Sequence, residues 1–125
     1  MISGNEKEKD NLILNESKTF AIRIIKLYKF LIGTKQEYVL SKQLLKCGTS
    51  IGANVRESVY AQSKMDFISK LSIALKESNE TSYWLELLHE TNYLDETQFN
   101  SIYNDCEKIK AILINIINTI KTKIV

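Results

Sequence analysis

Two stretches of the chain carry apolar residues at alternating spacings of three and four. The spacing places these residues along one side of an α-helix, whereas a strand would alternate them between two faces. The pattern therefore predicts two long amphipathic helices that share a core. The predicted core positions of the first of these helices are Phe67, Leu71, Ala74, Ser78, Thr81, Leu85 and Leu88, with Thr81 as a polar position. Those of the second are Phe99, Ile102, Cys106, Ile109, Leu113, Ile116 and Ile120.

Two earlier stretches show the same helical periodicity. Because the connections between the periodic stretches are short, successive helices should run antiparallel. We predict an all-α fold, an up-down-up-down four-helix bundle over residues 17–122, preceded by a flexible N-terminal tail over residues 1–16. The predicted helices span residues 17–33, 36–60, 63–91 and 95–121.

Capping residues set these boundaries. Ser17 and Gly33 are typical of the N-terminal and C-terminal ends of a helix, and they bound the first one. Ser63 followed by Asp66 forms a variant of the capping box before the third helix. Asp95 can cap the fourth helix in the same way. The chain contains no proline, so nothing forces a break inside the helices.

The first helix is apolar over an unusually wide arc. A first seam contains Phe20, Ile24, Leu27 and Leu31, and a second contains Ile25, Tyr28 and Ile32. A solitary bundle needs only one apolar stripe on each helix. The second seam therefore predicts burial against another subunit, and so a homo-oligomer.

The second helix places small residues beside its core face. Its predicted core positions are Leu40, Leu44, Cys47, Ile51, Val55 and Ser58. Gly48 and Gly52 each cost a helix about 1 kcal/mol relative to alanine, and they are tolerated where another backbone comes close. We expect this flank of the helix to touch a neighbouring helix.

Composition narrows the class of protein. With 125 residues and 44% hydrophobic residues, the chain suits one globular domain. No stretch is long and apolar enough to cross a membrane, and the N-terminal region does not resemble a secretory signal, so we expect a cytoplasmic protein. Cys47 and Cys106 lie at core positions, where we expect free thiols, although a disulfide between them stays open.

Charge is distributed unevenly along the chain. Residues 17–60 hold eight basic and two acidic side chains, a net charge of +6, whereas residues 61–96 hold three basic and seven acidic ones, a net charge of −4. Such an imbalance is typical either of solvated or mutually complementary helix faces or of a surface for nucleic acid. The candidate phosphate contacts are Arg23, Lys26, Lys29, Lys42, Lys46 and Arg56.

Catalytic patterns are weak. Glu86 and His89 have the spacing of a di-iron helix motif, but that site needs a second histidine, and His89 is the only one in the sequence. We therefore expect His89 to face solvent. The sequence contains no phosphate-binding glycine loop and no activated nucleophile. It predicts no enzyme activity, no cofactor, no metal site and no small-molecule substrate.

The segment 41–58 is more specific than a generic helix. Its core, Ser-Ile-x-x-Asn-x-x-Glu over residues 50–57, resembles the four-helix bundle proteins whose genes were first noticed in intervening sequences of bacterial 23S ribosomal RNA. The resemblance continues through Asp66 and Phe67 and covers residues 17–120. Members usually have glycine after that glutamate, where this chain has Ser58.

The resemblance implies a left-handed antiparallel bundle that assembles as a homopentamer. The family is similar to the accessory protein of diversity-generating retroelements, a basic pentamer that binds nucleic acid and a reverse transcriptase. Ser50, Asn54 and Glu57 match the family core. For Asn54 and Glu57 the resemblance implies hydrogen bonding at a helix or subunit junction, with direct ligand binding as the alternative.

Two functions are left in competition. The first is a non-enzymatic oligomer that binds RNA or DNA weakly through the basic face of its first two helices. The second is a protein-interaction scaffold whose charged faces dock subunits or partners. Nothing in the sequence indicates readout of bases, so nucleic-acid binding would depend on phosphate charge.

Overall fold

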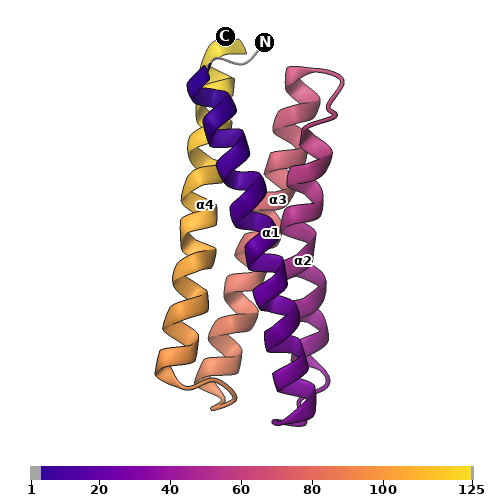
Figure 1. Ribbon diagram of the computed structural model, residues 1–125, viewed down its shortest axis with the longest axis vertical. Coiled ribbons are helices and arrows are strands. Elements are labelled where there is room, and N and C mark those ends of the chain that lie inside the picture. Colours follow the sequence, from indigo (N-terminus) through magenta and orange to yellow (C-terminus); the bar gives the residue numbers. More distant parts are fainter. Residues whose placement is uncertain (1–3, 125) are drawn as a thin grey trace.

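The computed structural model describes the backbone of residues 4–124 and the side chains of residues 12–123. It contains four helices: α1 (Gly4–Gly33), α2 (Leu40–Ser58), α3 (Lys64–Glu90) and α4 (Glu96–Ile124). The described residues form no strand. Successive helices run antiparallel, so that the start of α1 and the end of α4 lie at the same end (Figure 1). The predicted all-α, up-down-up-down bundle is confirmed.

The helices form a four-cornered arrangement. Each packs on two neighbours, through the seams α1–α2, α2–α3, α3–α4 and α1–α4. Within the described residues the diagonal pairs make no comparable contact, and the α1–α4 seam is the least extensive of the four. This seam therefore has the most room for a surface groove.

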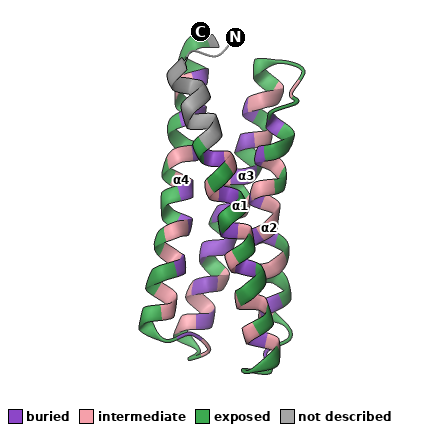
Figure 2. Cartoon of the chain, viewed as in Figure 1, coloured by how far each residue is buried: buried purple, intermediate pink, exposed green. Residues whose placement is uncertain are grey.

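All four helices contribute buried residues to one core, and these residues recur along the described part of the bundle (Figure 2). The predicted periodicity of α3 and α4 is confirmed from Leu71 and Ile102 onward, including the polar position Thr81, which is fully buried. Only the first predicted core position of each helix differs, because Phe67 and Phe99 are half-buried. No helix in the described part of the chain has the length and hydrophobicity of a membrane span.

The start of α1 differs from the prediction. The helix begins at Gly4 instead of Ser17, so residues 4–16 are helical and not part of the predicted tail; residues 1–3 lie outside the described part. Ile13 is only 2% exposed and lies seven residues before Phe20, on the same face. Ser17 is buried inside the helix, where its hydroxyl donates to the carbonyl of Leu14, so it is no N-cap. The end at Gly33 is as predicted.

The start of α2 also differs. The predicted helix began at residue 36, but Gln36 has a φ of 54° and α2 begins only at Leu40. The carboxylate of Glu37 accepts hydrogen bonds from the backbone amides of Val39 (3.0 Å), Leu40 (2.7 Å) and Ser41 (2.7 Å). Backbone amides at the start of a helix have no carbonyl of a preceding turn to bond to. The Glu37 carboxylate supplies the acceptors for these three amides.

The caps of α3 and α4 follow the prediction. The hydroxyl of Ser63 accepts a hydrogen bond from the amide of Asp66 at 3.0 Å. At the start of α4, Asp95 Oδ1 accepts from the amide of Gln98 at 2.8 Å, and Gln98 Oε1 accepts from the amide of Asp95 at 3.0 Å. This reciprocal pair is a capping box. The fourth helix then continues to Ile124, beyond the predicted end at residue 121.

The two helical glycines of α2 lie against α1. A Cβ atom on Gly48 would lie 2.8 Å from Cγ1 of Ile24, and one on Gly52 would lie 3.2 Å from the backbone oxygen of Ser17. Both positions are therefore occupied by the neighbouring helix. The predicted close approach is confirmed, and it fixes how α1 crosses α2.

Candidate nucleic-acid interface

Five of the six predicted phosphate contacts are exposed on α1 and α2. They are Lys26, Lys29, Lys42, Lys46 and Arg56. None of the five makes an ion pair within the described residues. Their charges are therefore free to meet an anion. We call these five side chains the basic face.

Arg23 differs from the other five. Its guanidinium pairs with Asp105 of α4 at 2.5 Å and donates to the hydroxyl and carbonyl oxygens of Ser101 at 2.9 and 3.3 Å. The Arg23 charge is thus balanced by a carboxylate of the same bundle. Its main contact joins α1 to α4, so we leave it out of the basic face.

The stretch from Lys26 to Glu57 holds two acidic residues, Glu37 and Glu57. Glu37 is 7% exposed, and its carboxylate is bonded to the start of α2 rather than to a lysine. Burial raises the pKa of Glu37, but the hydrogen bonds from the amides of Leu40, Ser41 and Val39 outweigh it, so the pKa is lowered overall. Glu57 is then the only exposed acidic residue of α2.

The residues of the family core lie on one side of α2. The amide nitrogen of Asn54 donates to the carbonyl of Ser50 at 2.9 Å and contacts its hydroxyl at 3.1 Å. Both side chains are half-buried, and Glu57 is exposed. These hydrogen bonds stay within α2 and join no second helix of the same chain.

A groove opens along the α1–α4 seam. It has a volume of about 370 Å³. Its lining residues are Arg23, Lys26, Leu27 and Phe30 from α1, and Gln98 and Ile102 from α4. The floor is apolar, and Lys26 belongs both to this groove and to the basic face. The sequence offered no signal for the groove, since its two sides are about 70 positions apart in the chain.

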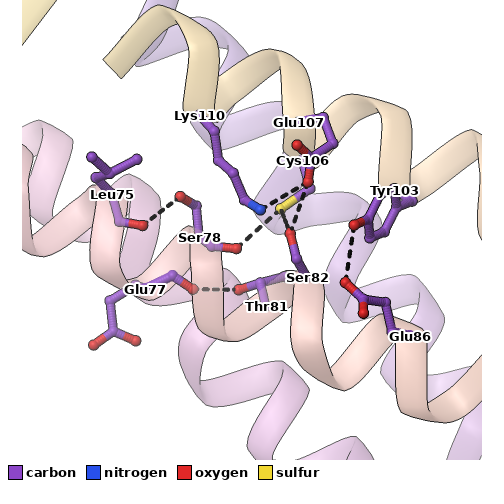
Figure 3. A network of polar contacts seen from close by, with 10 residues as sticks. All are labelled: Leu75, Glu77, Ser78, Thr81, Ser82, Glu86, Tyr103, Cys106, Glu107 and Lys110. Atoms are coloured by element: carbon purple, nitrogen blue, oxygen red, sulfur yellow. Dashed lines mark hydrogen bonds and ion pairs between the residues drawn. The ribbon is translucent and has the colours of Figure 1, made fainter. Parts of the chain in front are cut away.

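A polar network crosses the α3–α4 seam, which sequence reasoning missed (Figure 3). The hydroxyl of Ser82 donates to Glu107 at 3.2 Å and lies 3.5 Å from the sulfur of Cys106. Lys110 pairs with the same Glu107 oxygen at 2.8 Å. The Cys106 thiol donates to the carbonyl of Ser78 at 3.4 Å. Small polar residues at core positions were the only signal, and they do not identify their partners.

Acidic and aromatic side chains also contact one another where this seam approaches the α3–α4 connection. Tyr103 donates its hydroxyl to Glu86 at 2.9 Å, and burial, followed by this carboxylate, raises the pKa of Tyr103 to about 12. His89 is stacked on Phe99 with ring centroids 4.3 Å apart, and it is half-buried rather than facing solvent as predicted. Glu86 and His89 therefore contact different partners. Among the described residues, no three His, Cys, Asp or Glu side chains are grouped to hold a metal ion.

Both cysteines are buried free thiols. Burial raises the pKa of Cys47 and of Cys106 to about 11. The thiolate is the reactive form of cysteine, so these two side chains are poor nucleophiles at neutral pH. They fill core positions, and Cys47 accepts a hydrogen bond from Thr81 at 3.3 Å.

Comparisons with known proteins address the whole bundle. A comparison with curated protein sequences gave no match. One solved structure, a protein of unknown function from the S23 ribosomal protein family of Bacteroides thetaiotaomicron, is similar with a TM-score of 0.87 and 56% sequence identity. The match covers 88% of this chain and 98% of that one.

The profile of the 23S rRNA-intervening sequence proteins matches residues 9–115. The match includes most of α1, all of α2 and α3, and two thirds of α4. Neither this family nor the similar structure indicates an enzymatic activity. The family resemblance predicted from residues 41–58 is confirmed, and this chain belongs to the 23S rRNA-intervening sequence protein family.

Proposed function

We propose that this protein is a non-enzymatic homo-oligomer, most simply a pentamer, that binds nucleic acid weakly through the basic face. The observation that carries the proposal is the placement of Lys26, Lys29, Lys42, Lys46 and Arg56. All five are exposed on two adjacent helices and free of ion pairs within the described residues. An oligomer would repeat this face several times, so that weak contacts act together on one long strand.

Binding of this kind should be electrostatic. The five side chains are flexible lysines and one arginine on convex helices, and a phosphate backbone can meet them without base readout. Each neutralised phosphate releases counterions, so affinity should fall steeply as salt rises. The whole chain carries a formal charge of only +2, which limits the expected affinity.

Gel shifts with RNA and DNA at about 50 and 200 mM salt test the proposal. We expect a shift at the lower concentration that is lost at the higher one. The variant Lys42→Gln/Lys46→Gln should weaken binding, while the matched variant Lys64→Gln/Lys70→Gln on α3 should not. Absence of any shift at low salt refutes nucleic-acid binding.

A second candidate is a scaffold without nucleic-acid affinity. It is favoured by apolar side chains on the outer side of α1: Ile22 is 46% exposed and Ile25 is 39% exposed. With the half-buried Tyr28 and Ile32, they leave an apolar strip beside the lysines. On this hypothesis Lys42→Glu/Lys46→Glu changes the oligomer mass measured by light scattering. On the leading one it abolishes nucleic-acid retention at an unchanged mass.

A further inference from the structure

The α1–α4 groove combines features that the basic face lacks. Its lining includes the apolar side chains of Leu27, Phe30 and Ile102 and the charged side chain of Lys26. Its volume of about 370 Å³ is near the lower end of the range for small-molecule pockets, roughly 300–1,000 Å³. The groove therefore suits one flat, mostly apolar group that carries an anion beside it.

The groove is lined by one aromatic ring, that of Phe30. Phe30 is half-buried, and the ammonium of Lys35 lies 5.9 Å from its ring centre. Aromatic rings beside lysines are the arrangement with which proteins hold unstacked bases of single strands. A double helix keeps its bases stacked inside, so it can reach the lysines but not the groove.

The polar groups of the groove fit a base edge. The side-chain carbonyl of Gln98 is used by the amide of Asp95, which leaves the Gln98 NH₂ group as a donor toward a base oxygen or nitrogen. The nearby carboxylates have partners: Asp105 pairs with Arg23, and Asp95 caps α4. Little unpaired negative charge on this side would repel a phosphate.

We propose that this groove takes one unstacked base of a single-stranded nucleic acid, stacked on Phe30, with the adjoining phosphate on Lys26. The inference rests on the proposed function and adds to it a strand preference: single strands bind at the groove and the basic face, and duplexes at the basic face only. A second copy of this chain, or an apolar side chain of a protein partner, is the competing occupant.

Fluorescence anisotropy with a labelled single strand of about 12 nucleotides, and with a duplex of the same length, tests the strand preference. Phe30→Leu keeps an apolar floor but removes the ring, so it should weaken single-strand binding about fivefold to a hundredfold and leave duplex binding unchanged. The matched control is Tyr83→Leu, an exposed aromatic on α3 that lies outside both the groove and the basic face. It should leave the strand preference intact.

Photocrosslinking gives a second readout on the unaltered chain, in case Phe30→Leu does not fold. A single strand carrying 5-iodouracil should crosslink to the tryptic peptide of residues 30–35, which begins with Phe30. A crosslink only elsewhere, or equal strand affinities that Phe30→Leu does not change, overturns the groove while the proposed function stands. Failure to bind either strand refutes the proposed function as well. A changed oligomer mass for Phe30→Leu, with binding unchanged, assigns the groove to a second copy.

Discussion

The α1–α2 and α3–α4 seams join sequence-adjacent antiparallel helices, yet they are held by different means. At α1–α2 two glycines let the helices approach until Gly48 meets Ile24 and Gly52 meets the backbone of Ser17. At α3–α4 Ser82, Glu107 and Tyr103 take part in hydrogen bonds across the seam. The first seam depends on the absence of side chains, and the second on polar partners that must be in register.

The difference has a consequence for the surfaces. On α1 and α2 the lysines form no ion pairs within the described residues, because the seam between them is made by apolar and small residues. On α4, Lys108 and Lys110 pair with Glu16 and Glu107. The lysines of α1 and α2 are thus available as a basic face, whereas two lysines of α4 are held by carboxylates of the same bundle.

The largest expected effect comes from filling the glycine contact. Gly48→Leu should lower the free energy of unfolding by at least about 2 kcal/mol, because even a Cβ would lie 2.8 Å from the buried Ile24. The loss is net of about 1 kcal/mol gained in helix propensity. Urea denaturation followed by circular dichroism measures it.

Gly33 provides the matched control for that substitution. A Cβ on Gly33 meets nothing within 4 Å, and its φ is not positive. Gly33→Ala should therefore be neutral or stabilise the protein by up to about 1 kcal/mol. If Gly48→Leu is as stable as the wild type, this result contradicts the close packing of α1 against Gly48 of α2.

The second effect concerns the connection that leads into α2. Glu37→Gln removes the charge from three hydrogen bonds and should cost about 1–2 kcal/mol at neutral pH. The folded pKa of Glu37 is lowered, so its contribution is complete above the unfolded pKa and is lost as pH falls through the folded pKa.

Urea midpoints of the wild type and of Glu37→Gln at about pH 7, 5 and 3.5 measure this dependence. The gap between the two proteins should close toward the acid end. The α3–α4 connection differs from this one, because the backbone amides of Tyr93 and Leu94 donate to the carbonyl of Leu88 and no carboxylate takes part in these bonds. A gap that stays constant with pH contradicts the capping role of the carboxylate.

The smallest of the three effects tests the polar seam. Ser82→Ala removes the hydrogen bond to Glu107 and the contact with Cys106, and it should cost about 1 kcal/mol. Ser72→Ala, on an exposed position of the same helix, should change stability by less than about 0.5 kcal/mol. Equal stabilities of the two variants would show that the network adds nothing to the apolar core.

Sequence periodicity predicted the architecture well, because helix spacing and burial are local properties. The sequence predicted the buried positions of α3 and α4 and the caps at Ser63 and Asp95. It also predicted the close approach of a neighbouring helix at Gly48. The early start of α1 was not predicted, since Leu12, Ile13 and Leu14 are three consecutive apolar residues, and such a triplet does not show which side of a helix is buried.

The missed features depend on partners far apart in the chain. Arg23 meets Asp105 across 82 positions, so the sequence showed a free basic residue where the fold has an ion pair. Glu37 was missed for a different reason. In the sequence, a glutamate just before an apolar helical pattern is interpreted as part of the first turn of the helix. Only the positive φ of Gln36 in the structure shows that the chain turns at this point and that the helix begins later.

The central claim is that the basic face meets phosphates, and the salt dependence of binding tests it most directly. The logarithm of the association constant should fall linearly with the logarithm of salt concentration, with a slope near the number of phosphates contacted. The slope should become shallower by about one unit for each phosphate-contacting lysine removed in Lys42→Gln/Lys46→Gln. A slope near zero, or one that this variant does not change, would contradict the account.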